Sequence, residues 1–439
     1  MQLTKRTSRR RLKQYQAWLL VLASPLIASR VAGTQGILAD PAPSPLLIPQ
    51  AMLDSVTNNE MTVFAPAIAG GDNGLPQPFQ YGPVTLRPHV DYSFSYGNGI
   101  LAGPTNQQNT ATHQISPGIL AQLGYHWTLD YTPTIRFYSN NQFKDGVDHA
   151  LSLVGGTHYE DWTLGLSQSF LFSTAPTSET GAQTEQEAFG TGLTATRVLN
   201  EKLSLDLGLN QAFASAAELQ TSRDWSTMDW INYRFTPRLS VGAGAGMGYL
   251  NVDFGSDQMH EQLQARVEWR ATDKLSLQLT GGGEDRQYVE STTPDSLTPI
   301  FSGGIQYQPF QNTQISVSAG RSVTASLVPG SDTTATSFGA NLNQRLLQKF
   351  SLDVGASYNQ SEYTETTFQV KQISATWYQA SLRNVGRTDD YYSFNVRLSH
   401  PFLRRGTWSV YYQYNDNQSS TAGMSYRGSQ IGFNLSYRY

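Results

Sequence analysis

Residues 84–96 read Val84-Thr85-Leu86-Arg87-Pro88-His89-Val90-Asp91-Tyr92-Ser93-Phe94-Ser95-Tyr96, and their alternation indicates the fold class. Apolar residues and one proline alternate with polar residues throughout. Because successive side chains of a β-strand point to opposite faces, a strand here has one apolar and one entirely polar face. Its length of about 13 residues exceeds the usual soluble strand and suits a tilted membrane strand, which needs roughly 9 to 11 residues.

The same alternation closes the chain over residues 431–439 and recurs between the two ends. A tight polar turn is followed eight times by an apolar residue, a Ser or Thr, and another apolar residue. The copies begin at Trp127, Trp162, Leu203, Leu239, Leu275, Ile315, Phe350 and Trp408. Such spacing fits two long strands and a loop, so each repeat predicts a hairpin. Two strands precede the first copy, and eight hairpins bring the total to about 18, an even number as in bacterial barrels.

The connections also differ between the two ends of the predicted strands, and aromatic residues lie near one of these ends. Turns before each signature are short, whereas those in the middle of a repeat are longer, as at 97–108, 173–184 and 359–389. Near the short turns lie Tyr125, Trp127, Trp162, Trp269, Tyr307, Phe402, Trp408, Tyr437 and Tyr439. Aromatic girdles and unequal loops are typical of outer-membrane barrels. Because hydrocarbon offers unpaired amides no partner, the sheet must close.

The predicted fold is therefore all-β, a closed antiparallel transmembrane β-barrel of about 18 strands over residues 81–439. A soluble β-propeller is the alternative, but each blade needs four short strands and these repeats have room for two long ones. Residues 1–33 predict a signal peptide, because basic residues precede an apolar run. Residues 8–13 partly mimic a twin-arginine signal. Residues 34–80, rich in Pro and Ala, predict an irregular periplasmic linker. The absence of cysteine agrees with export.

The start and the end of the predicted barrel resemble a known family. The residues are Pro78-Phe79, Tyr81-Gly82-Pro83-Val84 and the final hairpin that begins at 408–414 and closes at 426–439. They are similar to the β-barrel porin type 2 family, which includes barrels found with exopolysaccharide operons. The resemblance covers roughly residues 78–439. It implies an outer-membrane barrel of a Gram-negative bacterium, and it brings no agreed substrate and no catalytic motif.

The sequence offers little sign of catalytic chemistry. Its seven histidines have no HExxH or other metal-ligand spacing, so no metal is expected. Residues 281–283 are glycines without the lysine of a phosphate loop. Serine, histidine and acidic residues are all present, but their abundance makes a chance triad easy. We therefore expect no enzyme and no cofactor. The net charge of -4, with basic residues scattered, gives no nucleic-acid binding stripe.

The polar face is where function is expected. Its candidate lumen-facing charges are Arg87, His89, Asp91, Asp130, Arg136, Asp206, Arg266, Glu268, Arg270, Asp353 and Arg397. Both signs are mixed, which favours a weakly selective channel for passive diffusion of small hydrophilic solutes, or plain solvation of a polar wall. The alternatives are a barrel for export or attachment of polysaccharide and a structural or adhesive barrel without conductance.

Two further expectations concern the lumen and the partners. Glycines at 242, 244, 246 and 248 leave one strand bare, so residues 359–389 are predicted to fold against it and narrow the channel; otherwise these glycines relieve strain in a curved sheet. The expected partners are outer-membrane lipid, small solutes, and the barrel-assembly machinery through the C-terminal strand ending at Tyr439. Whether the chain forms a homo-oligomer is left open by the sequence.

Overall fold

The computed structural model describes residues 79–439, except 100–107, 177–182, 218, 290, 292–293, 327–330, 348 and 373–377. The predicted signal peptide and nearly all of the predicted linker lie outside the described residues. Everything described belongs to one compact unit, Pro41–Tyr439. Among the described residues every regular element is a β-strand, and none of them forms a helix long and apolar enough to cross a membrane.

Eighteen strands form the wall, and a three-residue strand, β1 (Phe79–Tyr81), is added at one end. The wall strands are β2 (Val84–Gly97), β3 (Thr110–Leu123), β4 (Trp127–Tyr138), β5 (Gly146–Tyr159), β6 (Trp162–Ser173), β7 (Gln186–Val198), β8 (Leu203–Ala216), β9 (Thr221–Thr236), β10 (Leu239–Val252), β11 (Gln258–Thr272), β12 (Leu275–Tyr288), β13 (Ser296–Phe310), β14 (Thr313–Ala325), β15 (Ser331–Leu346), β16 (Phe350–Gln372), β17 (Tyr378–Phe402), β18 (Gly406–Ser419) and β19 (Tyr426–Arg438).

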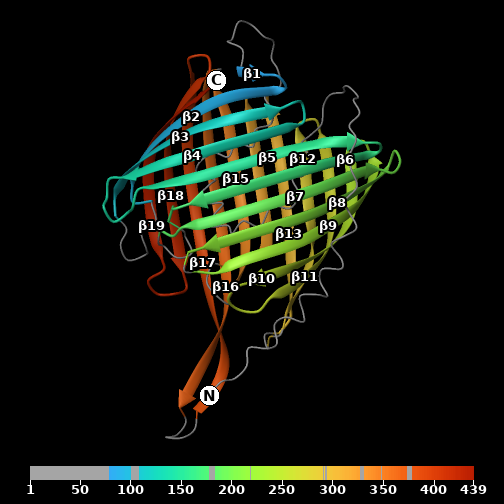
Figure 1. Cartoon of the computed structure of the whole chain (residues 1–439), viewed down its shortest axis with the longest axis vertical. Coiled ribbons are helices and arrows are strands. Elements are labelled where there is room, and N and C mark those ends of the chain that lie inside the picture. The colour runs from blue at the N-terminus through green and yellow to red at the C-terminus, as the bar shows by residue number, and fades with distance from the viewer. Residues whose placement is uncertain are drawn as a thin grey trace. The chain divides into compact units, whose positions relative to one another are not determined.

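Each strand pairs antiparallel with its neighbours in sequence, and the last strand pairs with the first. The closing ladder of β19 and β2 runs from Gln430↔Gly97 to Arg438↔His89. The ring of strands is therefore closed (Figure 1), as a membrane-spanning sheet requires because hydrocarbon offers edge amides no partner. The predicted closed barrel of eighteen strands is confirmed.

The strands begin close to where the repeated signature predicts them. β4, β6, β8, β10, β12 and β16 begin on the first residue of a copy, and β14 and β18 begin two residues before one. The connections at this end are short, the longest being 199–202. The connections at the opposite end range in length from the shortest, at 217–220, to 98–109. The shortest of them is therefore no longer than the longest short turn.

The interval 359–389 differs from the expectation of a loop. β16 and β17 continue their ladder through it as far as Gln372↔Tyr378. In Figure 1 this hairpin extends away from the other strands instead of crossing the barrel. The two segments satisfy each other's backbone groups, so they need no support from the lumen wall. The predicted packing of 359–389 against the glycine strand is wrong for this structure.

Candidate functional site

The two faces of the barrel wall differ sharply in chemistry. Cross-strand partners share a face, so the ladders assign each side chain to the inside or the outside. Side chains on the inner face include buried Arg136, Asn232, Glu284, Arg286 and Gln413. On the outer face large apolar side chains are exposed, among them Leu263 at 71% and Ile231 at 57%. This reverses the distribution of a soluble protein and fits a wall with lipid outside and water inside.

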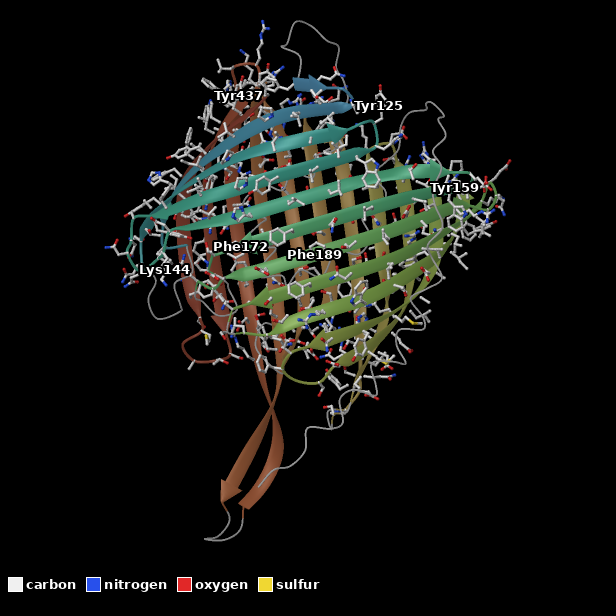
Figure 2. The ribbon with its side chains drawn as sticks, in the orientation of Figure 1. Tyr125, Lys144, Tyr159, Phe172, Phe189 and Tyr437 are labelled. Carbon is white, nitrogen blue, oxygen red and sulfur yellow. The ribbon has the colours of Figure 1, made fainter. Side chains whose placement is uncertain are left out.

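Aromatic side chains ring the barrel at the short-turn end. Figure 2 labels Tyr125, Tyr159 and Tyr437 along this end and Lys144 at the other. Two arginines lie over rings there: the Arg197 guanidinium is 5.6 Å from the Trp162 ring, and that of Arg405 is 4.7 Å from the Tyr439 ring. Aromatic rings with cations beside them suit the headgroup level of a membrane.

A second set of outer-face aromatics marks the long-loop end, and β9 spans both sets. Its Phe235 is 57% exposed near the short turns, and its Trp225 is 56% exposed ten residues away. At about 3.3 Å per residue and a tilt of about 40°, these rings are separated by roughly 25 Å along the barrel axis, the height of the apolar band in outer-membrane barrels. Asp229 lies between them on the same face and is exposed.

Ion pairs cross the inner wall at several heights. Arg136 on β4 contacts Asp148 on β5 at 2.6 Å, and both side chains are at most 10% exposed. His260 Nε2 lies 3.0 Å from Asp224 Oδ1, across β10. Arg266 on β11 reaches Asp206 on β8. Arg136 and Arg266 thus each face a carboxylate, which lowers the net field that a passing ion meets.

The glycines of β10 are not an empty strip, contrary to the expectation from the sequence. A Cβ on Gly244 would lie 2.5 Å from Trp230 Cδ2, and one on Gly248 would lie 2.3 Å from a His260 ring atom. The Arg266 guanidinium in turn lies 4.6 Å from the Trp230 ring. Large inward side chains of β9 and β11 therefore lie over the glycines. The glycines make room for these side chains, not for a loop.

All eleven candidate residues lie on the inner face by register. They are Arg87, His89 and Asp91 on β2, Asp130 and Arg136 on β4, Asp206 on β8, Arg266, Glu268 and Arg270 on β11, Asp353 on β16 and Arg397 on β17. Besides the pairs above, His89 Nε2 is 3.0 Å from Thr132 Oγ1, and that hydroxyl donates to Asp130 Oδ1 at 3.0 Å. Asp353 accepts a hydrogen bond from Asn343.

The sequence reasoning missed several inner-face charges. They are Asp148, Asp224, His260, Glu284 and Arg286, together with Asp332, which reaches the same surface from β15. The alternation of polar and apolar residues could have predicted the first five of these residues, because each occupies a position of its strand that points to the polar face. The alternation could not have predicted Asp332, because its contacts form only where β14 and β15 separate from β13.

The described part of the chain has no group of three or more His, Asp or Glu side chains placed to hold a metal ion. Its charged groups pair along the wall instead of converging on one point. The arrangement can solvate a water-filled passage and interact with solutes that pass through it.

The model of the family described as Putative beta-barrel porin 2 matches residues 255–439. No curated protein matches the chain. Among solved structures, the chain is similar to OccAB3 of Acinetobacter baumannii, at 9% identity over 81% of this chain and 99% of that one, with a TM-score of 0.43. It is also similar to OccK2 (OpdF) of Pseudomonas aeruginosa, at 10% identity over 81% and 97% with a TM-score of 0.43.

The family match agrees with the family that the barrel ends resemble. The fold defines the class of protein: a closed antiparallel barrel with an apolar exterior and a polar interior is an outer-membrane β-barrel. The outer-membrane localisation predicted from the sequence is confirmed.

Proposed function

We propose that the chain is a passive outer-membrane channel for small hydrophilic solutes. The observation that carries this proposal is the polar inner wall of an eighteen-stranded barrel, with exposed groups such as Arg87 and Arg270 among its side chains. Barrels of this size enclose an aqueous lumen unless something plugs it. The mixture of both charge signs along the wall supports weak ion selectivity.

Two further elements belong to this proposal. The barrel-assembly machinery would engage β19, whose end closes the sheet against β2. The barrel would act as a porin and not as an enzyme, because its described charged groups lie along the wall instead of converging on one point. Association with a second copy would occur through the lipid-facing exterior.

The experiment is conductance of the refolded chain in a planar bilayer. We expect discrete, ohmic steps, and swelling of protein-containing liposomes in small neutral sugars but not in large dextrans. Heat-modifiable migration on a gel verifies that the same preparation contains closed barrels. A heat-modifiable barrel without conductance would reject the channel and leave the structural or adhesive function.

Export of an acidic polysaccharide is a second candidate, favoured by one observation. Five inner-face arginines are exposed near the short turns: Arg87, Arg234, Arg270, Arg345 and Arg438. A basic mouth raises the local concentration of anions. Anion selectivity in a salt gradient, together with glycosyltransferase genes beside this gene, would favour export. Lack of anion selectivity and neighbours of other kinds would favour the simple channel.

A further inference from the structure

Toward the long-loop end, the hairpin formed by β14 and β15 separates from its neighbour β13. The ladder of β13 and β14 reaches Phe301↔Arg321 and stops there. The ladder of β14 and β15, in contrast, continues to Ala325↔Asp332. β13 still pairs with β12 as far as Arg286↔Ser296. The hairpin therefore separates from β13, while its two strands stay together and β15 stays paired with β16 as far as Ser331↔Glu365.

The separated segment touches strands that are not its neighbours. Gln258 Nε2, at the start of β11, donates a hydrogen bond to Asp332 Oδ1 at 2.8 Å. Tyr288 on β12 donates its hydroxyl to Asp332 Oδ2 at 2.6 Å. Arg286 on β12 donates to the Val323 carbonyl at 3.2 Å. All of these contacts pass over β13.

The register shows on which side of the wall these contacts lie. Arg286 pairs with His260, which pairs with Gly248, and Gln258 pairs with Tyr288. These positions all have the parity of the polar inner face. Hence the hairpin lies inside the barrel, against the inner surface of β11 and β12. We call its described residues, 322–325 and 332–335, the inward hairpin.

Burial agrees with this placement. Val323 on the inward hairpin is 6% exposed, and Ile300 on the inner face of β13 is 7% exposed. By register Val323 has the parity of the outer face, where side chains of the regular wall are largely exposed. It is covered because the hairpin's outer face packs on the inner wall.

Arg286 links the hairpin to the inner wall in this position. Its guanidinium contacts Glu284 at 2.5 Å, donates to Gln258 Oε1 at 2.7 Å and lies 3.9 Å from Asp332. The side chains of Arg286 and Glu284 are each 4% exposed. One arginine thus links the wall to both strands of the hairpin. Its removal would leave two carboxylates buried without their positive partner.

We propose that the inward hairpin narrows the channel near its long-loop end and that Arg286 is the residue that keeps it there. This inference rests on the proposed channel function, since a constriction has meaning only for a barrel that conducts. It assigns the narrowing to described residues of β14 and β15, and not to the interval 359–389 predicted from the sequence.

The first test compares two arginine variants in planar bilayers. Arg286→Gln removes the positive charge that joins the hairpin to the wall, and we expect conductance to rise about twofold because the entrance widens. Arg223→Gln is the control, because Arg223 also pairs with a carboxylate near the long-loop end, Asp253 at 3.1 Å, but lies on the outer face of β9. Conductance is expected to stay at the wild-type value. Equal conductance of Arg286→Gln and wild type would overturn the constriction.

The second test fixes the hairpin covalently. The chain has no cysteine, so Gln258→Cys with Asp332→Cys gives one defined pair. We expect a short bis-methanethiosulfonate linker to join them in the folded barrel and to return the Arg286→Gln variant to wild-type conductance. A folded, heat-modifiable barrel that does not cross-link would reject the inward position. Cross-linking in a barrel that never conducts would instead reject the channel and leave the hairpin's position standing.

Discussion

At the residue scale, the glycines of β10 are explained by their neighbours. The Trp230 ring lies so near Gly244 that a Cβ there would be 2.5 Å from the ring, and Met228 Cε would be 2.8 Å away. A larger residue must push the indole out of its place under Arg266. Space on this strand is thus already used by side chains from β9 and β11.

Gly244→Ala is accordingly expected to destabilise the barrel by about 1–3 kcal/mol, because the added methyl group overpacks the inner wall. The measurement is the urea midpoint of unfolding in lipid vesicles, followed by tryptophan fluorescence. Gly281→Ala is the control, since a Cβ there would meet nothing nearer than 3.8 Å. Equal midpoints for the two variants would show that Trp230 does not lie over Gly244.

Asp229 is an exception to the apolar exterior. It lies on the outer face opposite Ala245, and its Oδ1 accepts a hydrogen bond from the Gly208 amide at 3.2 Å. The ladder of β8 and β9 is interrupted there, between Asp206↔Trp230 and Leu209↔Thr227. The side chain thus satisfies a backbone donor that the ladder leaves unpaired.

Asp229→Asn keeps an acceptor for the Gly208 amide and removes the charge facing lipid. We expect it to stabilise the barrel, by less than about 2 kcal/mol, since acidic residues are less unfavourable than basic ones on a lipid face. The urea midpoint measures this change. Asp273→Asn is the control, because Asp273 lies in a short turn with its side chain 93% exposed. A lower midpoint for Asp229→Asn would mean that the charge itself holds Gly208.

At the element scale, the connection at 253–257 is fastened by one carboxylate. Tyr249 donates its hydroxyl to Asp257 Oδ2 at 2.7 Å, and the Asn251 amide and the Val252 backbone N–H donate to Oδ1 at 2.9 and 3.2 Å. Burial alone would raise the pKa of Asp257, but the three hydrogen bonds outweigh it and lower the pKa. The ionised carboxylate therefore stabilises the turn.

The pH dependence follows from the direction of this shift. With a folded pKa below the unfolded one, the contribution is complete above the unfolded pKa of about 3.8 and disappears as the pH falls through the lower folded value. We expect Asp257→Asn to lower the unfolding midpoint at pH 7 and the difference from wild type to vanish as the pH approaches the folded pKa. A difference that stays constant into acid would exclude ionisation as the cause.

The sequence predicts the strands well and the departures from them poorly. Six strands begin on the signature residue itself, because a turn followed by alternation is a local pattern. The inward hairpin has no local signature, since Asp332 meets Gln258 only through folding of the whole wall. Likewise, polar residues within 359–389 read as a loop, although the backbone of this interval forms a ladder. The polar–apolar periodicity predicts which face of the wall a residue occupies, but it does not predict contacts between residues far apart in the sequence.

At the scale of the whole molecule, the mean hydropathy of -0.39 is an average over two unlike surfaces. Alternation places apolar residues outside and polar residues inside, so any window along a strand contains both. This is why the composition resembles that of a soluble protein although the exterior is apolar. Closure of the sheet, not overall hydrophobicity, makes the chain compatible with a bilayer.

The orientation of the barrel gives a prediction for the intact cell. The last strand ends at the short turns, and bacterial barrels have their short turns in the periplasm. Lys144, in a connection at the opposite end, should therefore face the exterior, and Lys274, in a short turn, the periplasm; both are exposed.

Single cysteines test this, because the chain has no other thiol. Lys144→Cys is expected to react with a polymer-linked maleimide, too large for the channel, in intact cells. Lys274→Cys should react only after the outer membrane is permeabilised. Both substitutions lie outside the ladders, so heat-modifiable migration should be unchanged. Labelling in the reverse order would show that the barrel has the opposite orientation in the membrane. The exposed inner-face arginines near the short turns would then face the medium.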